Sequence, residues 1–287
     1  MGGAPYELTN TVIGFYISIF LLETAKIPPV YTSLIVFIGR IWDGVSDPIV
    51  AYLVSRTNSK YGVLKPWMVV GAPLATVAYF CVWYVPETES IGSKVAWYLL
   101  FYCAFQTFLT CYQMPFGTYM LFVTDQQDER DSAENFRMGI EMIATIIGTE
   151  LMGLSLSFSD AHTKQGSGCS ANATNVTVPP EVVEFQIKGY MIGAMCICGI
   201  CLICAIAVIA GTTERISSKP FKIPRDEPFF AALKRVLTFK PWLLHVGAFI
   251  SFVMALQFMQ ANFVLFSKYD VGMKNYQNGV ILVLVQL

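Results

Sequence analysis

Three charged side chains lie within one helix-length apolar segment, at the start of the stretch GRIWDGVSDPIVAYLVSRTNSKYGVLKPW, residues 39–67. On a helix, Asp43 and Asp47 are four residues apart and share a face, and Arg40 falls on the same side. Two carboxylates and one guanidinium leave one negative charge in excess, which a monovalent cation or a proton would neutralise. Because an ionisable residue within a membrane span is costly, we interpret the three residues as a candidate coupling-ion site.

A structural ion pair between Arg40 and one of the aspartates is the simpler alternative. One arginine cannot neutralise both carboxylates, which favours the ion site. Pro48 follows Asp47 directly and predicts an interruption of the span. That interruption would either free backbone carbonyls as ion ligands or form a simple packing kink.

The composition is that of a polytopic membrane protein. Hydrophobic residues make up 55% of the chain and charged residues 14%, and the mean hydropathy is +0.54, far from the profile of soluble domains. The net charge is −1 and no basic patch carries interleaved aromatic residues, so nucleic acid is excluded as a partner. Outside the ion cluster there is no nucleophile, metal-ligand or acid/base constellation, so we expect no enzyme, no cofactor and no further metal site.

Hydropathy predicts an all-α membrane protein, with each span near the twenty apolar residues that a bilayer requires. The predicted spans cover residues 6–22, 29–54, 66–85, 95–123, 137–158, 189–211 and 241–266. We therefore expect a six-helix bundle over residues 1–211, a cytoplasmic linker with an interfacial helix over 212–240, and the incomplete start of a second bundle over 241–287.

Polar residues interrupt the fourth span at Gln106, Thr107, Thr110 and Gln113. Gln106, Thr110 and Gln113 share one helix face, which suits a helix that lines an aqueous cavity. Hydrogen bonding between helices, without any ligand, is an equally good explanation.

Arg137 and Glu141 are four residues apart at the start of the fifth span, after the charged stretch DQQDERDSAENFR. They either pair with each other or belong to a gate that closes on the cavity.

The four cysteines of CICGICLIC in the sixth span spread over a wide arc of a helix. We interpret them as small buried hydrophobic residues rather than metal ligands.

Two independent signals give the orientation. The loop over residues 159–185 contains two N-glycosylation sequons, at Asn172 and Asn175, which place it outside. Twelve of the nineteen Lys and Arg residues lie on the side of the linker and six on the other, with Arg40 inside a span. The positive-inside rule therefore puts the linker in the cytoplasm, in agreement with the sequons.

Six spans, a long cytoplasmic linker and the start of another set are the plan of a major facilitator transporter cut soon after its midpoint. The stretch from residue 39 to 67 resembles the second helix and following loop of the melibiose-permease-type sodium symporters. Further stretches narrow the resemblance to the animal sodium-dependent lysophosphatidylcholine symporters: GGAPY, WYLLFYCAFQTFLTCYQMPF, ERDSAENFRM, the sequon loop and NFVLF. The likeness covers nearly the whole chain.

The resemblance implies a symporter that takes up lysophospholipid together with sodium from the outer leaflet of the plasma membrane. Its partners would be the lysophospholipid, the sodium ion and membrane lipid, and the endoplasmic reticulum membrane would be a second location. In this resemblance, Asp43 and Asp47 match sodium-binding aspartates and Arg40 the adjoining arginine. Gln106, Thr107, Thr110 and Gln113 would face the headgroup path, and Arg137 and Glu141 would match charged residues near an inner gate.

Two alternative functions remain: sodium-coupled symport of a sugar or another small solute, and a truncated regulatory membrane protein that does not transport. Alternating access requires two bundles. We therefore expect the 287-residue chain alone not to transport.

Overall fold

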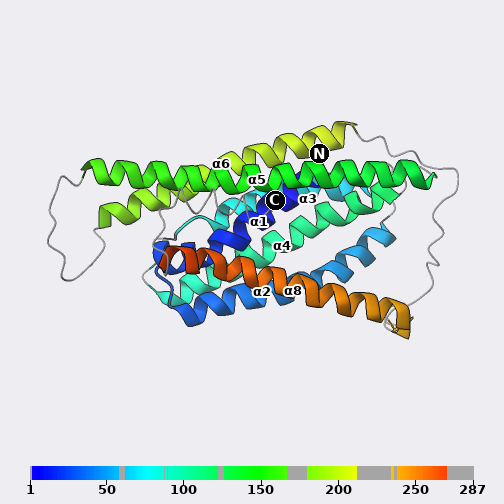
Figure 1. Cartoon of the computed structure of the whole chain (residues 1–287), viewed down its shortest axis with the longest axis horizontal. Helices are drawn as coiled ribbons and strands as arrows, with labels where there is room; N and C mark the ends of the chain where they lie inside the picture. The colour runs from blue at the N-terminus through cyan, green and yellow to red at the C-terminus, as the bar shows by residue number, and fades with distance from the viewer. Residues whose placement is uncertain are drawn as a thin grey trace.

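The computed structural model describes residues 2–57, 62–86, 88, 90–121, 126–166, 180–211, 234–235 and 238–269. These residues form long helices and contain no strand (Figure 1), so the predicted all-α class is confirmed. The elements are α1 (Ala4–Ile19), the π-helical turn η1 (Phe20–Thr24), α2 (Pro29–Arg56), α3 (Lys65–Val82), α4 (Ile91–Leu121), α5 (Gln127–Gly166), α6 (Pro180–Gly211) and α8 (Lys240–Tyr269).

Four helices are long and apolar enough to cross a membrane, within the described part of the chain. Their apolar segments are Lys65–Val82, Ile91–Tyr119, Gln127–Phe158 and Glu184–Gly211, in α3, α4, α5 and α6. The apolar part of α8, Lys240–Ala255, is shorter. The other two predicted spans are less plain: α1 has 16 residues before η1 continues it, and α2 has 28 residues but carries the charged cluster.

Two helices, α5 and α6, begin nine to ten residues earlier than the sequence predicts. α5 starts at Gln127, so most of the charged stretch expected to be a loop is helical, and α6 starts at Pro180. Hydropathy finds the apolar part of a helix, not its ends. Asp128 and Glu129 in the first turn of α5 also favour a helix N-terminus through the helix dipole.

The predicted interruption of the second span at Pro48 is wrong. α2 runs without a break from Pro29 to Arg56, with Pro48 inside it. A proline within a helix removes one backbone hydrogen bond, and the helix continues on both sides of it.

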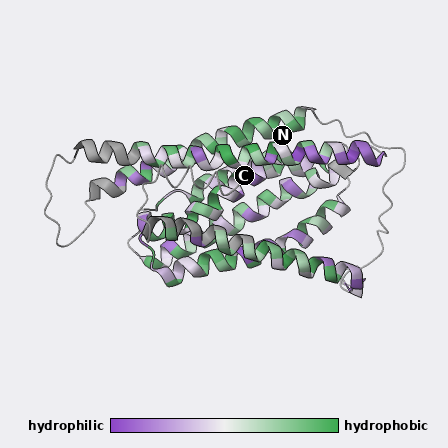
Figure 2. Ribbon diagram, viewed as in Figure 1, coloured by the Kyte–Doolittle hydropathy of each residue, from purple (hydrophilic) through white to green (hydrophobic). Residues whose placement is uncertain are grey.

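α1 is the central element of the bundle. It packs on α5 and α6, and it also contacts α8. Its apolar side chains are almost entirely covered, with Leu8, Val12 and Phe15 each at most 2% exposed. Around it α3 packs on α4 and α6, and α2 packs on α4. Figure 2, coloured by residue hydropathy, shows that α6 is mainly hydrophobic and that the start of α5 is hydrophilic.

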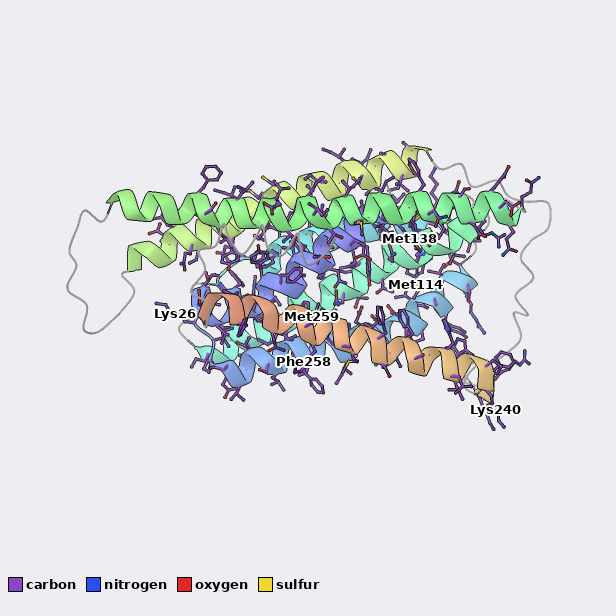
Figure 3. All side chains as sticks on the ribbon, viewed as in Figure 1. Lys26, Met114, Met138, Lys240, Phe258 and Met259 are labelled. Carbon is purple, nitrogen blue, oxygen red and sulfur yellow. The ribbon has the colours of Figure 1, made fainter. Side chains whose placement is uncertain are left out.

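A cluster of aromatic rings joins the helices at one end of the bundle. Phe20 of η1 meets Trp83, Tyr98 and Tyr190 edge-on, with ring centroids 5.0–6.0 Å apart. Trp83 and Tyr190 stack at 5.5 Å. These rings therefore tie η1 to the C-terminal end of α3 and to α4 and α6. Lys26 follows η1 at this end, and Lys240 of α8 lies at the opposite end (Figure 3).

Gly71 sets the distance between α3 and α4. A Cβ atom at this position would lie 3.0 Å from the Tyr112 backbone nitrogen and 3.1 Å from the Phe108 carbonyl oxygen of α4. Backbone atoms of a helix cannot move aside singly, so only glycine permits this approach. Small residues have this role at helix contacts in membranes.

We expect Gly71→Ala to destabilise the bundle by roughly 1–3 kcal/mol, the usual cost of overpacking. The measurement is the thermal midpoint of the detergent-purified protein, followed by size-exclusion fluorescence. Gly199→Ala on α6 is the matched control, since a Cβ there meets nothing within 4 Å. Equal midpoints for the two variants would show that α3 and α4 can separate without loss.

Candidate ion site

The charged cluster of α2 lies on the inner side of that helix. Asp43 and Asp47 are each partly buried, as is Arg40. Asp43 interacts electrostatically with both Asp47 and Arg40, so the three side chains share one side of α2, as their spacing predicts. Two carboxylates beside one guanidinium give the group an excess negative charge in a partly covered setting.

α4 supplies neutral hydroxyl groups to the cluster. The Thr110 hydroxyl donates a hydrogen bond of 2.9 Å to the Asp47 carboxylate. One turn earlier, the Trp42 indole nitrogen donates to the Thr107 hydroxyl at 2.8 Å. These two bonds join α2 to α4 directly. They explain in part why the fourth span carries polar residues.

The two glutamines of the predicted cavity face lie at different depths on α4. Gln106 is 3% exposed. Gln113 is partly buried, and its side-chain oxygen has no hydrogen-bond partner among the described residues. One small cavity, of about 20 Å³, lies between α1, α3, α4 and α6, and none of the four predicted cavity residues lines it.

α1 contributes a residue that the sequence pattern did not single out. The Tyr6 phenol interacts electrostatically with Asp43, Asp47 and Arg40, so the start of α1 faces the cluster. The first span is assigned from its apolar residues, and its polar residues are given no role. The polar pair Tyr6 and Glu7 in its first turns is the signal that could have marked it.

A second charged group lies between α1 and α5. Arg137 forms an ion pair with Glu134 and a longer one, 3.6 Å, with Glu141. The predicted pairing of Arg137 with Glu141 is therefore present, although it is shared. Glu7 of α1 interacts electrostatically with both Glu141 and Arg137, and the Glu141 carboxylate fills the space that a side chain at Gly3 would need.

Other predicted positions give no further site. Asn172 and Asn175 lie outside the described residues. In the described part of the chain, no group of three or more His, Cys, Asp or Glu side chains is arranged to hold a metal ion. Of the cysteines of α6, Cys201 is buried and Cys196 is exposed, so they face different surroundings.

The chemistry available at the α2 cluster is the binding of a small cation by oxygen atoms. Carboxylate and hydroxyl oxygens are ligands suited to hard cations.

A profile of MFS/sugar transport proteins matches residues 1–287. The chain belongs to this family. Helices α1 to α6 are accordingly those of a major facilitator N-terminal bundle, and α8 is the first helix of the next.

Individual relatives are also similar over nearly the whole chain. A sodium-dependent lysophosphatidylcholine symporter 1-B from Danio rerio is 38% identical, and the human sodium-dependent lysophosphatidylcholine symporter 1 is 32% identical. A sphingosine-1-phosphate transporter from Xenopus tropicalis is 34% identical. Each comparison covers 99% of this chain and 55–56% of the relative, so the chain spans about half the length of the curated relatives it matches.

We expect Thr110→Val, which keeps the shape but removes the hydroxyl, to lower the free energy of unfolding by about 1.5 kcal/mol, because a hydrogen bond to a charged group is lost. Thermal midpoints of purified protein measure the effect, and Thr110→Ser should restore it. Thr118→Val is the control, since that hydroxyl bonds only to its own helix at the Met114 carbonyl. Equal thermal midpoints for the two valine variants would show that the Thr110–Asp47 bond does not stabilise the bundle.

Proposed function

We propose that the chain acts in sodium-coupled symport of lysophospholipids of the lysophosphatidylcholine type. One observation carries the proposal: Asp43 and Asp47 share one partly covered site with an excess negative charge, and a hydroxyl from α4 holds Asp47. A monovalent cation balances that charge. The relatives named as sodium-dependent symporters make sodium the ion and lysophospholipid the substrate to test first.

In this proposal Asp43 and Asp47 bind sodium, and Arg40 limits the site to one positive charge. Gln106, Thr107, Thr110 and Gln113 face the path of the lipid headgroup. Gln106 and the Gln113 oxygen are buried. In this role they meet the headgroup when the helices move apart during alternating access.

Arg137 and Glu141 form the inner gate in the same proposal. They pair on α5, and Glu7 of α1 interacts electrostatically with both, which supports a gate at which α1 and α5 separate. Residues 1–211 act as the first bundle, 212–240 as the cytoplasmic linker and 241–287 as the start of the second. The protein works in the plasma membrane, with Asn172 and Asn175 glycosylated outside.

We expect Asp43→Asn and Asp47→Asn each to reduce sodium-dependent uptake of labelled lysophosphatidylcholine by roughly tenfold or more, the effect of losing about 1.4 kcal/mol of ion binding. Uptake is measured in cells that express the coding region to its natural stop codon, with sodium or choline as the external cation. Asp131→Asn is the matched control, because Asp131 is exposed at the start of α5.

The same cells distinguish the competing functions. Labelled glycosides replace the lipid in a parallel assay, since the family description includes sugar transport; sodium-dependent glycoside uptake without lipid uptake would replace the proposed substrate. Lipid uptake that is unaffected by both asparagine variants would reduce the aspartates to structural ion-pair members. Uptake by the 287-residue chain alone would refute the expectation that it does not transport.

A further inference from the structure

Tyr102 of α4 has a buried hydroxyl group that its surroundings do not satisfy. The side chain is 1% exposed, and its hydroxyl oxygen has no hydrogen-bond partner in the described residues. A buried phenol normally finds a partner, because leaving it unpaired costs free energy. A hydroxyl without one is therefore a position where a ligand or a water molecule is expected.

The Tyr102 ring lies at the contact between α2 and α4, where the ion site also lies. Tyr102 interacts electrostatically with Arg40 and Asp43, the two residues at the start of the charged cluster. Thr110, two turns further along α4, bonds to Asp47 at the other end of the cluster. On a helix, residues 102, 106 and 110 share one face, so α4 presents two hydroxyl-bearing side chains along the length of the cluster.

Gly39 is the reason that Tyr102 can lie there. A Cβ atom at residue 39 would overlap the Tyr102 ring and lie 3.1 Å from its Cζ atom, which carries the hydroxyl group. Gly39 and Asp43 are one helical turn apart on α2, on the same face. The missing side chain at residue 39 thus lets the ring lie against α2, one helical turn from Asp43.

We infer that the Tyr102 hydroxyl supplies a neutral oxygen to the shell of the cation held by Asp43 and Asp47, and that Gly39 positions it. This inference rests on the proposed function, because it names a further ligand group of the same site. It divides the site into two ends, each with one carboxylate and one neutral hydroxyl: Asp43 with Tyr102, and Asp47 with Thr110. The phenol adds an oxygen without adding charge, so the excess charge of the site still matches one monovalent cation.

The test is Tyr102→Phe, which removes the oxygen and keeps the ring. In cells that express the coding region to its natural stop codon, the sodium concentration for half-maximal lysophosphatidylcholine uptake should rise about fivefold or more, as expected for the loss of one polar contact. The maximal rate at saturating sodium should be retained. Gly39→Ala should raise the same sodium requirement, because it displaces the ring.

Tyr98→Phe is the matched control on the same helix. Its side chain is equally buried, at 1% exposed, but its hydroxyl donates to the Tyr84 carbonyl at 3.2 Å. It should lower thermal stability and leave the sodium requirement unchanged. Binding of radioactive sodium to the purified protein gives a second measurement that does not depend on transport.

The outcomes separate the inference from the proposed function. If wild-type uptake requires sodium and both aspartate variants abolish it, but Tyr102→Phe keeps the wild-type sodium requirement and binding, the inference alone fails. If wild-type protein neither needs nor binds sodium, the proposed function fails first. A higher sodium requirement in Tyr98→Phe equal to that in Tyr102→Phe would also overturn the inference, because the effect would then follow from packing.

Discussion

The charged side chains of α2 set the main constraint on this bundle, because hydrocarbon cannot solvate them. The two faces of α2 differ accordingly. Ile41, Val45 and Ile49 are about half exposed, which suits contact with apolar surroundings. Asp43 and Asp47 lie on the other side, partly covered and next to polar groups of neighbouring helices. The arrangement of α1 and α4 around α2 follows from this division.

Glycines let α4 approach two of its neighbours closely. Gly71 brings α3 against the α4 backbone, and Gly39 lets an α4 ring lie against α2. Helices within a membrane gain little from hydrophobic association, so close packing and interhelical hydrogen bonds must hold them. The Thr110–Asp47 and Trp42–Thr107 bonds add that second kind of contact on the α2 side. One helix thereby supports both its neighbours.

The sequence predicts the parts of this structure that depend on spacing along one helix. The gathering of Arg40, Asp43 and Asp47 follows from helical periodicity alone, and so does the existence of the apolar helices. The ends of α5 and α6 are missed because a charged helix and a charged loop look the same in a hydropathy profile. The polar pair Tyr6 and Glu7 marks the start of the first span as unusual, but no pattern within one helix shows which residues Tyr6 faces. The contact between Gly39 and Tyr102 could not be found at all, since it depends on which helices are neighbours.

The position of α1 explains how the two charged groups of the bundle are related. Tyr6 interacts with the aspartates of α2, and Glu7, the next residue, interacts with Arg137 and Glu141 of α5. Successive residues on a helix point in directions about 100° apart, so a single turn of α1 faces both groups at once. A movement of α1 as a rigid body displaces Tyr6 and Glu7 together, relative to the aspartates of α2 and to the charged pair of α5. Any coupling between the ion site and the charged group on α5 therefore has a short physical route, through the first turns of one buried helix.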